Sequence, residues 1–284
     1  MATEEPYMPI HVGKALHPDV DLGIQGDNTG DNISLKNGSY CELTGMYWAW
    51  KNLKDVDVIG LCHYRRYFDF HGQCRRFRPY ELFPTEKFSS LNISIPDRFL
   101  DGLKEGEAVV AAPRHYMNSI YFDYCCCHYS DDFRILHKVV EKTQPKDMQR
   151  AFFKIMYMNN LLSPTNMFLM TWHDFDEYCT FMFGILEEVE KYTDITHYNP
   201  VQARIYGYMS ERLFNVWLYA KRIKLFKRPI LWINDQPPAD DPSALRILQR
   251  NVRGWINVRL ANPRVHDLSE SFRNFTLVEK KLAR

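Results

Sequence analysis

The chain has 284 residues, of which 45% are hydrophobic and 25% charged, and this composition suits one large globular domain or two small ones. Lysine and arginine together number 36 against 35 acidic residues, so the formal net charge of +1 excludes a global basic field for nucleic acid. The seven cysteines contain no CxxC pair, and neither an export signal nor a long apolar run is present. We therefore expect reduced thiols in a soluble cytoplasmic protein, at most peripheral to a membrane.

The chain opens with a long polar loop and an amphipathic helix. Residues 9–39 are rich in Gly, Asp, Asn and Ser, which predicts a loop. A helix is expected to follow from Ser39, because Ser39 and Glu42 fit the S-x-x-E capping box. Apolar residues then recur at helical spacing: Leu43, Met46, Tyr47, Trp50 and Leu53. This face belongs to the core, so Trp50 is expected to be structural.

Strands and helices alternate after this helix. The predicted strands cover residues 57–63, 107–113, 166–172 and 228–234. The predicted helices cover residues 96–105, 130–142, 146–158 and 209–222, and a further helix opens at Asp174 with Glu177 three residues later. This order predicts an α/β fold with an open sheet in residues 1–236. The more basic segment 237–284 is expected to pack on that domain as a helical tail.

The strand over 57–63 ends in the run His63-Tyr64-Arg65-Arg66. Ligands of open α/β sheets bind beyond the carboxyl ends of the strands. The planar guanidinium group of arginine can bond two phosphate oxygens at once, so Arg65 and Arg66 suit a diphosphate ligand. Tyr64 directly precedes them, and His63 could hold a further oxygen. The structural alternative is that one arginine pairs with Asp69 while the other is solvated.

The polar loop is a second candidate binding segment, because it places many short acceptors and amide donors on one backbone. These residues are Asp27, Asn28, Asp31, Asn32 and Asn37. Their spacing does not match an EF-hand calcium loop, so the hydroxyls of a sugar or ribose are better partners. Asp and Asn also bond to their own backbone in turns, and a purely structural loop is the alternative.

Three further polar residues lie near the ends of predicted elements. Glu211, in the first turn of the helix over 209–222, is either a general base or a favourable helix-dipole charge. Arg204 lies at the same loop-to-helix junction. Asn166, just ahead of a strand, either contacts a ligand or caps a turn. The sequence contains no P-loop, GxGxxG, GxSxG or HExxH motif, which disfavours P-loop NTPases, Rossmann dehydrogenases, serine hydrolases and zincins.

Between residues 7 and 233 the chain resembles the family of bacterial capsule, exopolysaccharide and O-antigen glycosyltransferases catalogued as domain of unknown function 4422. The motifs that carry this resemblance are, in order, "PIHVGK", "GDNTGDNIS", "YCELTGMYWAWKN", "GLCHYRRYF", "NMFLM", "FDEYC" and "RIYGYMSERL". The resemblance implies a GT-A-like mixed sheet flanked by helices, and a hexosyltransferase that takes UDP-galactofuranose or another UDP-hexose. It also implies a lipid-linked saccharide acceptor at the inner face of the plasma membrane.

Under this hypothesis Glu211 and His63 are the catalytic candidates, and the other polar residues named above hold the donor. Family members usually carry an apolar strand before the "PIHVG" motif, whereas only MATEEPYM precedes it here, so the first strand is expected to be missing or replaced. The alternative is a non-catalytic carbohydrate- or nucleotide-sugar-binding protein that retains the fold. The basic run Arg75-Arg76-Phe77-Arg78 motivates a third hypothesis of nucleic-acid binding, although no nucleic-acid partner is predicted.

Metal use is the last expectation. Nucleotide-sugar transferases usually hold a metal through Asp-x-Asp at the end of an apolar strand, and here the run from His63 to Arg66 takes that place. No metal site or cofactor is therefore predicted, since fixed arginines could neutralise the leaving diphosphate instead. Mg²⁺ or Mn²⁺ stays an alternative, because Asp27 and Asp31 could fold back to supply carboxylates.

Overall fold

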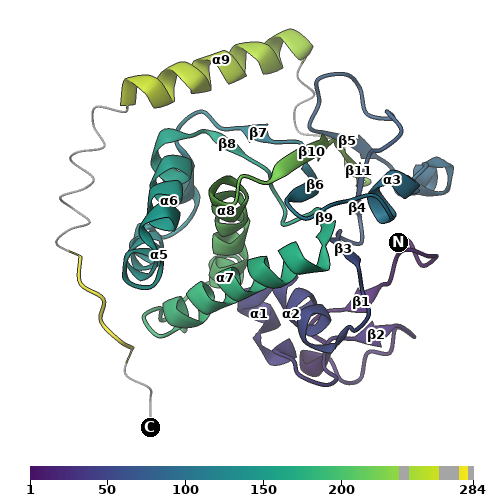
Figure 1. The fold of residues 1–284 in the computed structure, drawn as a ribbon, viewed down its shortest axis with the longest axis horizontal. Coiled ribbons are helices and arrows are strands. Elements are labelled where there is room, and N and C mark those ends of the chain that lie inside the picture. The colour runs from purple at the N-terminus through teal and green to yellow at the C-terminus, as the bar shows by residue number, and fades with distance from the viewer. Residues whose placement is uncertain (237–242, 262–274, 281–284) are drawn as a thin grey trace.

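A four-stranded mixed sheet lies at the centre of the fold (Figure 1). The computed structural model describes residues 1–236, 243–261 and 275–280. The strand order in this sheet is β10 (Lys224–Arg228), β6 (Glu107–Ala111), β9 (Phe168–Thr171) and β3 (Val58–Leu61). β10 is parallel to β6, and β9 is antiparallel to both β6 and β3. The carboxyl ends of β3, β6 and β10 therefore share one edge of the sheet with the start of β9.

A three-stranded sheet continues from this edge. Its order is β4 (Arg66–Phe68), β11 (Ile230–Ile233) and β5 (Tyr80–Phe83), with β11 antiparallel to β4 and parallel to β5. The turn between β3 and β4 thus joins the two sheets. Two small sheets complete the strands: β7 (Arg114–His115) with β8 (Leu161–Leu162), and β1 (Ile10–His11) with β2 (Gln25–Gly26).

A group of helices packs beside the central sheet (Figure 1). They are α4 (Ile120–Cys127), α5 (Ser130–Thr143), α6 (Lys146–Met158), α7 (Trp172–Glu190) and α8 (Ile205–Ala220). α8 contacts α5, α6 and α7, and its Leu213, Phe214 and Trp217 are fully buried. Because α8 is enclosed by other helices, it is apolar around most of its circumference rather than along one stripe.

The remaining helices are shorter or lie at the periphery. They are α1 (Asn37–Tyr40), α2 (Leu43–Asn52), α3 (Asp97–Leu100) and α9 (Ala244–Ala261), with 3-10 turns at Lys14–Leu16, Ser34–Lys36, Thr85–Ser90 and Gln202–Arg204. Within the described ranges, no helix is both long enough and apolar enough to cross a bilayer.

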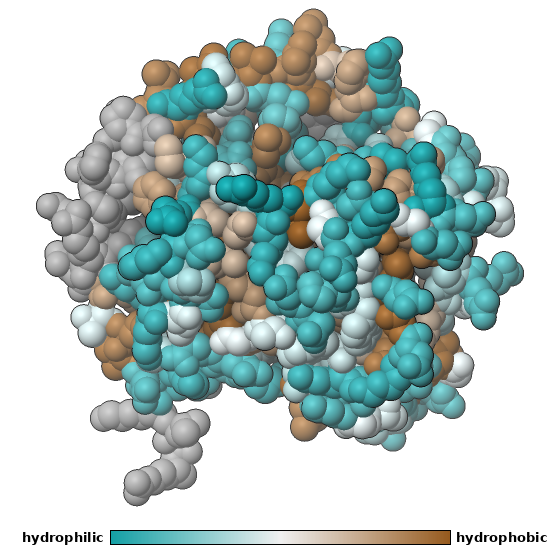
Figure 2. All heavy atoms as spheres, in the orientation of Figure 1, coloured by the Kyte–Doolittle hydropathy of each residue, from teal (hydrophilic) through white to brown (hydrophobic). Residues whose placement is uncertain are grey.

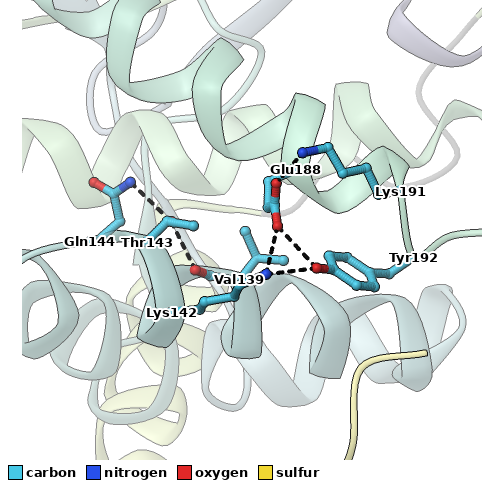
Figure 3. A network of polar contacts seen from close by, with 7 residues as sticks. All are labelled: Val139, Lys142, Thr143, Gln144, Glu188, Lys191 and Tyr192. Atoms are coloured by element: carbon cyan, nitrogen blue, oxygen red, sulfur yellow. Dashed lines mark hydrogen bonds and ion pairs between the residues drawn. The ribbon is translucent and has the colours of Figure 1, made fainter. Parts of the chain in front are cut away.

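A polar cluster ties α5 to the end of α7 (Figure 3). One carboxylate oxygen of Glu188 accepts hydrogen bonds from Lys142 Nζ at 2.9 Å and from the Tyr192 hydroxyl at 3.0 Å, and the other accepts from Lys191 Nζ at 2.5 Å. The ammonium groups of Lys191 and Lys142 lower the pKa of Glu188 to about 2. This cluster faces solvent, so its contribution to stability is small, but it fixes the position of one helix end against another.

The predicted fold class, an α/β protein with open mixed sheets flanked by helices, is confirmed. Several element boundaries were wrong. α7 begins at Trp172, because Thr171 rather than Asp174 caps it, and α3 ends at Leu100, before the weak helix formers Asp101 and Gly102. The polar loop contains β1, β2 and two 3-10 turns.

Two further expectations concern the ends of the chain, a missing or replaced first strand and a helical C-terminal tail. Residues 1–9 form no strand, and the central sheet starts in sequence with β3. The expected tail is helical over α9, while its residues 237–242, 262–274 and 281–284 lie outside the described ranges. The division into domains at residue 236 stays a prediction.

Candidate active site

The turn between β3 and β4 carries the predicted cluster of cations. The backbone N–H of Arg66 donates to the His63 carbonyl at 3.0 Å, which closes a tight turn with Tyr64 and Arg65 at its corners. Arg66 is already part of β4 and pairs with Trp232 of β11. Its guanidinium carbon lies 4.4 Å from the centre of the Trp232 ring, so the aromatic face holds the arginine side chain in place.

A cavity of about 350 Å³ opens beside this turn. Its walls combine three guanidinium groups with two carboxylates, one imidazole, aromatic rings and a thiol. The lining residues are Cys41, Glu42, His63, Tyr64, Arg65, Arg66, Arg204, Gly207, Tyr208, Glu211, Trp232 and Asn234. Segments far apart in sequence thus meet at the edge of the central sheet where β3 ends, which is the place where the sequence analysis expected a ligand. Arg204 and Glu211, predicted separately from the His63–Arg66 turn, share this cavity with it.

The arginines of the turn retain their hydrogen-bonding capacity. Among the residues that the structure describes, neither Arg65 nor Arg66 forms an ion pair or a side-chain hydrogen bond. The alternative of a salt bridge to Asp69 is not realised, because Asp69 accepts from the backbone N–H groups of His71 and Cys74 at 3.1 and 2.7 Å. Guanidinium donors beside a cavity are therefore available to an anion.

Glu42 is the main residue that the sequence analysis missed. It was assigned to a capping box with Ser39, but the helix breaks at Cys41, whose φ of 54° is left-handed. The Ser39 hydroxyl donates instead to the Lys36 carbonyl at 3.3 Å. The break turns the Glu42 side chain into the cavity, where Oε1 accepts a hydrogen bond from Asn166 Nδ2 at 3.0 Å.

Asn166 lies behind Glu42 rather than on the cavity wall. Its side chain is fully buried, and Nδ2 also donates to the Ser210 hydroxyl at 2.8 Å. Both amide hydrogens are thus used to connect the start of β9, the break after α1 and helix α8. The backbone of Asn166 is left-handed, with φ of 50°, a conformation that asparagine tolerates better than most residues. These contacts are those of a residue that positions Glu42, and direct contact of Asn166 with the donor stays a prediction.

Glu211 faces the cavity from the second turn of α8. Burial raises the pKa of its carboxyl group, and the nearby charge of Glu42 adds to this, while Arg212 and Arg66 oppose it. Burial dominates because a carboxylate removed from water loses its hydration. A carboxyl group with a raised pKa is suited to accept a proton near neutral pH.

His63 sits at the base of the turn with a fixed tautomer. Its Nε2 lies 2.7 Å from the Thr165 carbonyl oxygen, and because a carbonyl only accepts, Nε2 carries the hydrogen. Burial lowers the pKa of His63, and the charges of Arg66 and Arg204 add to this, while Glu42 and the hydrogen bond to Thr165 oppose it. His63 therefore offers Nδ1 as an acceptor, and its catalytic role stays a prediction.

Arg204 reaches the cavity from the start of α8. Its Nε donates to Cys41 Sγ at 3.1 Å, and burial raises the pKa of this thiol, which stays protonated. Gly207 lies directly beneath, where a Cβ would come within 3.1 Å of the same sulfur. The left-handed break at Cys41 thus positions both Glu42 and Arg204.

The predicted binding residues of the polar loop do not line this cavity. Asp27 is fully buried and accepts hydrogen bonds from the N–H groups of Gly13 and Lys14 and from the Ser34 hydroxyl. Asn32 bonds to backbone groups of Gly30 and Ser34, and Asn37 Nδ2 donates to the Cys41 carbonyl and the Thr44 hydroxyl. Asp31 accepts from the Tyr47 hydroxyl at 3.3 Å, and Asn28 is exposed. The contacts of the loop are those of the structural alternative, although donor binding by its exposed residues stays a prediction.

Neither metal nor cofactor use is decided by these contacts. In the described part of the chain, no group of three or more His, Cys, Asp or Glu side chains has an arrangement that would hold a metal ion. The cavity has two carboxylates, Glu42 and Glu211, against three arginines. Such a wall favours an anionic ligand over a free divalent cation.

Comparison with known proteins agrees with the predicted family. The family model described as Domain of unknown function (DUF4422) matches residues 1–222. The chain belongs to the DUF4422 family. Among solved structures, this DUF4422 chain resembles the apo structure of the bifunctional glycosyltransferase WbbM, with 27% sequence identity and a TM-score of 0.74. The match covers 86% of this chain and 46% of the WbbM chain, so the present chain spans about half the length of that protein. No curated protein matched.

Proposed function

We propose that this DUF4422 chain is a glycosyltransferase that moves a hexose from a UDP-sugar to a lipid-linked saccharide acceptor. The observation that carries the proposal is the cavity in which Arg65, Arg66 and Arg204 meet Glu42 and Glu211. The chain is similar over 86% of its length to a structure described as a bifunctional glycosyltransferase, and this similarity agrees with the proposed chemistry. Galactofuranose is our proposed sugar, on the basis of the family resemblance alone.

The arginines would stabilise the leaving group. Transfer breaks the bond between the sugar C1 and the diphosphate, and the negative charge that develops on the diphosphate needs fixed positive charge nearby. Arg65 and Arg66 are available for this, since among the described residues neither forms an ion pair or a side-chain hydrogen bond. Tyr64 is 65% exposed, its ring centre lies 5.2 Å from the Arg65 guanidinium carbon, and the ring would stack on the uracil.

Glu211 would take the proton of the attacking hydroxyl. A new bond forms between the acceptor oxygen and C1, the hydroxyl proton passes to the Glu211 carboxylate, and the nucleoside diphosphate departs with the electron pair. The raised pKa of Glu211 makes it a stronger base than a solvated glutamate. Glu42, fixed by Asn166, would accept hydrogen bonds from sugar hydroxyls.

Calorimetric titration with UDP and UDP-sugars tests donor binding. We expect saturable heat with UDP in the wild-type chain and strongly reduced heat in Arg66→Ala. A second measurement follows UDP release in the presence of a lipid-linked saccharide. Absence of nucleotide-dependent heat in a folded wild-type chain would reject the proposal, and heat without UDP release under any acceptor would favour the non-catalytic binding protein.

A further inference from the structure

Helix α9 presents an unusually apolar outer face. Its exposed large apolar side chains, which are 41–72% accessible, lie at helical spacing and form one stripe. They are Leu245, Leu248, Val252, Trp255, Ile256 and Leu260. Figure 2 shows hydrophobic side chains along the top edge of the molecule, where Figure 1 places α9. An exposed stripe of this kind is typical of an interaction surface.

The charges of α9 have one sign. Arg246, Arg250 and Arg253 are exposed along one flank of the stripe, and Arg259 lies with its guanidinium carbon 3.8 Å from the centre of the Trp255 ring. The helix from residue 244 to residue 261 contains no acidic residue. A helix that combines an apolar stripe, flanking arginines and a tryptophan has the composition of helices that lie in the plane of a membrane surface.

The opposite side of α9 is docked on the body of the protein. A Cβ on Gly254 would lie 2.3 Å from the Tyr116 carbonyl oxygen, so only glycine permits this approach. Asn257 Nδ2 donates to the Met117 carbonyl at 3.0 Å, and Val258 is buried. The helix is therefore held with its apolar stripe outwards, instead of turning that stripe towards the core.

Strand β7 connects α9 with the cavity. α9 lies against β7. Burial lowers the pKa of His115 in β7, and the charge of Arg250 in α9 adds to this. The neighbouring Arg114 lies with its guanidinium carbon 5.6 Å from the centre of the Tyr80 ring, and Tyr80 contacts Trp232 of the cavity wall with ring centres 5.6 Å apart. A surface bound by α9 would thus lie on the β7 side of the cavity.

We infer that α9 binds an anionic lipid surface and holds the cavity beside it. The stripe would enter the boundary between headgroups and acyl chains, while the arginines pair with lipid phosphates. A second copy of this chain is a poorer occupant, because two identical faces would bring arginines of like charge together. The inference rests on the proposed function in one respect only, because binding to a membrane would serve to bring the cavity close to a lipid-linked acceptor.

Vesicle co-sedimentation of the full chain tests the inference without any donor. The probes are phosphatidylcholine vesicles with and without phosphatidylglycerol. We expect binding to the anionic vesicles that weakens with salt, and its loss in the double variant Leu248→Glu/Val252→Glu. The matched control is Leu22→Glu/Leu35→Glu, which places the same charges on exposed leucines elsewhere and should bind like the wild type.

A second variant separates the charges from the stripe. Arg250→Gln/Arg253→Gln should weaken binding to anionic vesicles by about fivefold per arginine and leave the thermal melting temperature unchanged. Sedimentation velocity without vesicles examines the alternative occupant. A wild-type dimer that Leu248→Glu/Val252→Glu dissolves, or equal vesicle binding by this variant and the wild type, would overturn the inference. Neither result depends on whether the cavity binds UDP.

Discussion

The polar loop and the β3–β4 turn were both predicted to hold the donor, yet their polar groups are used in opposite ways. In the loop, the Asp27 carboxylate accepts from Gly13, Lys14 and Ser34. In the turn, Arg65 and Arg66 form no ion pair or side-chain hydrogen bond among the described residues. Short Asp and Asn side chains reach their own backbone, whereas arginines at the corner of a tight turn extend beyond it. Polar density alone therefore does not identify a binding segment.

The largest effect is expected for Glu211→Gln. This change keeps the shape of the side chain and removes its basicity, so sugar transfer should fall by roughly 10²- to 10⁴-fold. UDP affinity should change little, because the diphosphate is held by the arginines. Turnover of UDP-sugar by the purified variant measures the first effect, and calorimetry the second.

Glu177→Gln is the matched control, because Glu177 is a partly exposed glutamate that pairs with Lys221 outside the cavity. It should retain full turnover. If Glu211→Gln were as active as Glu177→Gln, Glu211 would not be the catalytic base. The difference between the polar loop and the β3–β4 turn would then be one of binding alone.

The pH profile should report the same carboxyl group. Because burial raises the pKa of Glu211, its basic form is fully present only above that raised pKa. Turnover divided by KM should therefore fall about tenfold per pH unit on the acidic side, with a midpoint above the usual glutamate value of about 4.3. A midpoint at or below that value would show that a titrating group other than Glu211 causes the fall in activity on the acidic side.

Asp27→Ala should affect stability rather than chemistry. The substitution leaves two backbone N–H groups and a hydroxyl without their acceptor in a buried position. An unsatisfied buried donor costs up to about 1–3 kcal/mol, and single substitutions seldom cost more than about 4 kcal/mol in total. We therefore expect the free energy of unfolding to fall by roughly 2–4 kcal/mol. Urea unfolding measures the loss, and Asp31→Ala at an exposed site is the control. A stable Asp27→Ala chain that cannot bind UDP would return the loop to the donor site.

Arg66→Ala should weaken UDP binding by tenfold or more, since a desolvated charge-assisted contact is worth roughly 1.5–3 kcal/mol. Arg76→Ala is the control, because Arg76 belongs to the exposed basic run outside the cavity. Arg66→Lys should restore part of the affinity, because it keeps the charge but loses the fork and the contact with Trp232. Equal affinities of all three variants would show that the turn is structural.

The fold could be predicted because its strands and helices carry strong periodic signals. β3, β6, α5 and α6 lie where apolar spacing places them. The three-stranded sheet could not be foreseen, because the pairing of Arg66 with Trp232 joins residues far apart in sequence. No local signal specifies such a register.

Within the site, the turn from His63 to Arg66 was predictable from its place at a strand end. Glu42 was not, because the capping-box pattern at Ser39 explained it well and the left-handed break at Cys41 has no glycine or asparagine to announce it. Arg204 and Glu211 were found in the sequence, but the cavity that gathers them with Glu42 is formed by tertiary contacts.

Chelation is expected to have the smallest effect. Three arginines already supply positive charge to the cavity, and they would repel a divalent ion unless extra carboxylates compensated. Asp27, the strongest candidate for compensation, would have to give up its hydrogen bonds to Gly13, Lys14 and Ser34. We therefore expect EDTA-treated enzyme to transfer sugar at nearly the untreated rate. Activity that chelation abolishes and Mn²⁺ or Mg²⁺ restores would show instead that the loop reorganises to bind metal, and that its buried carboxylate is not merely structural.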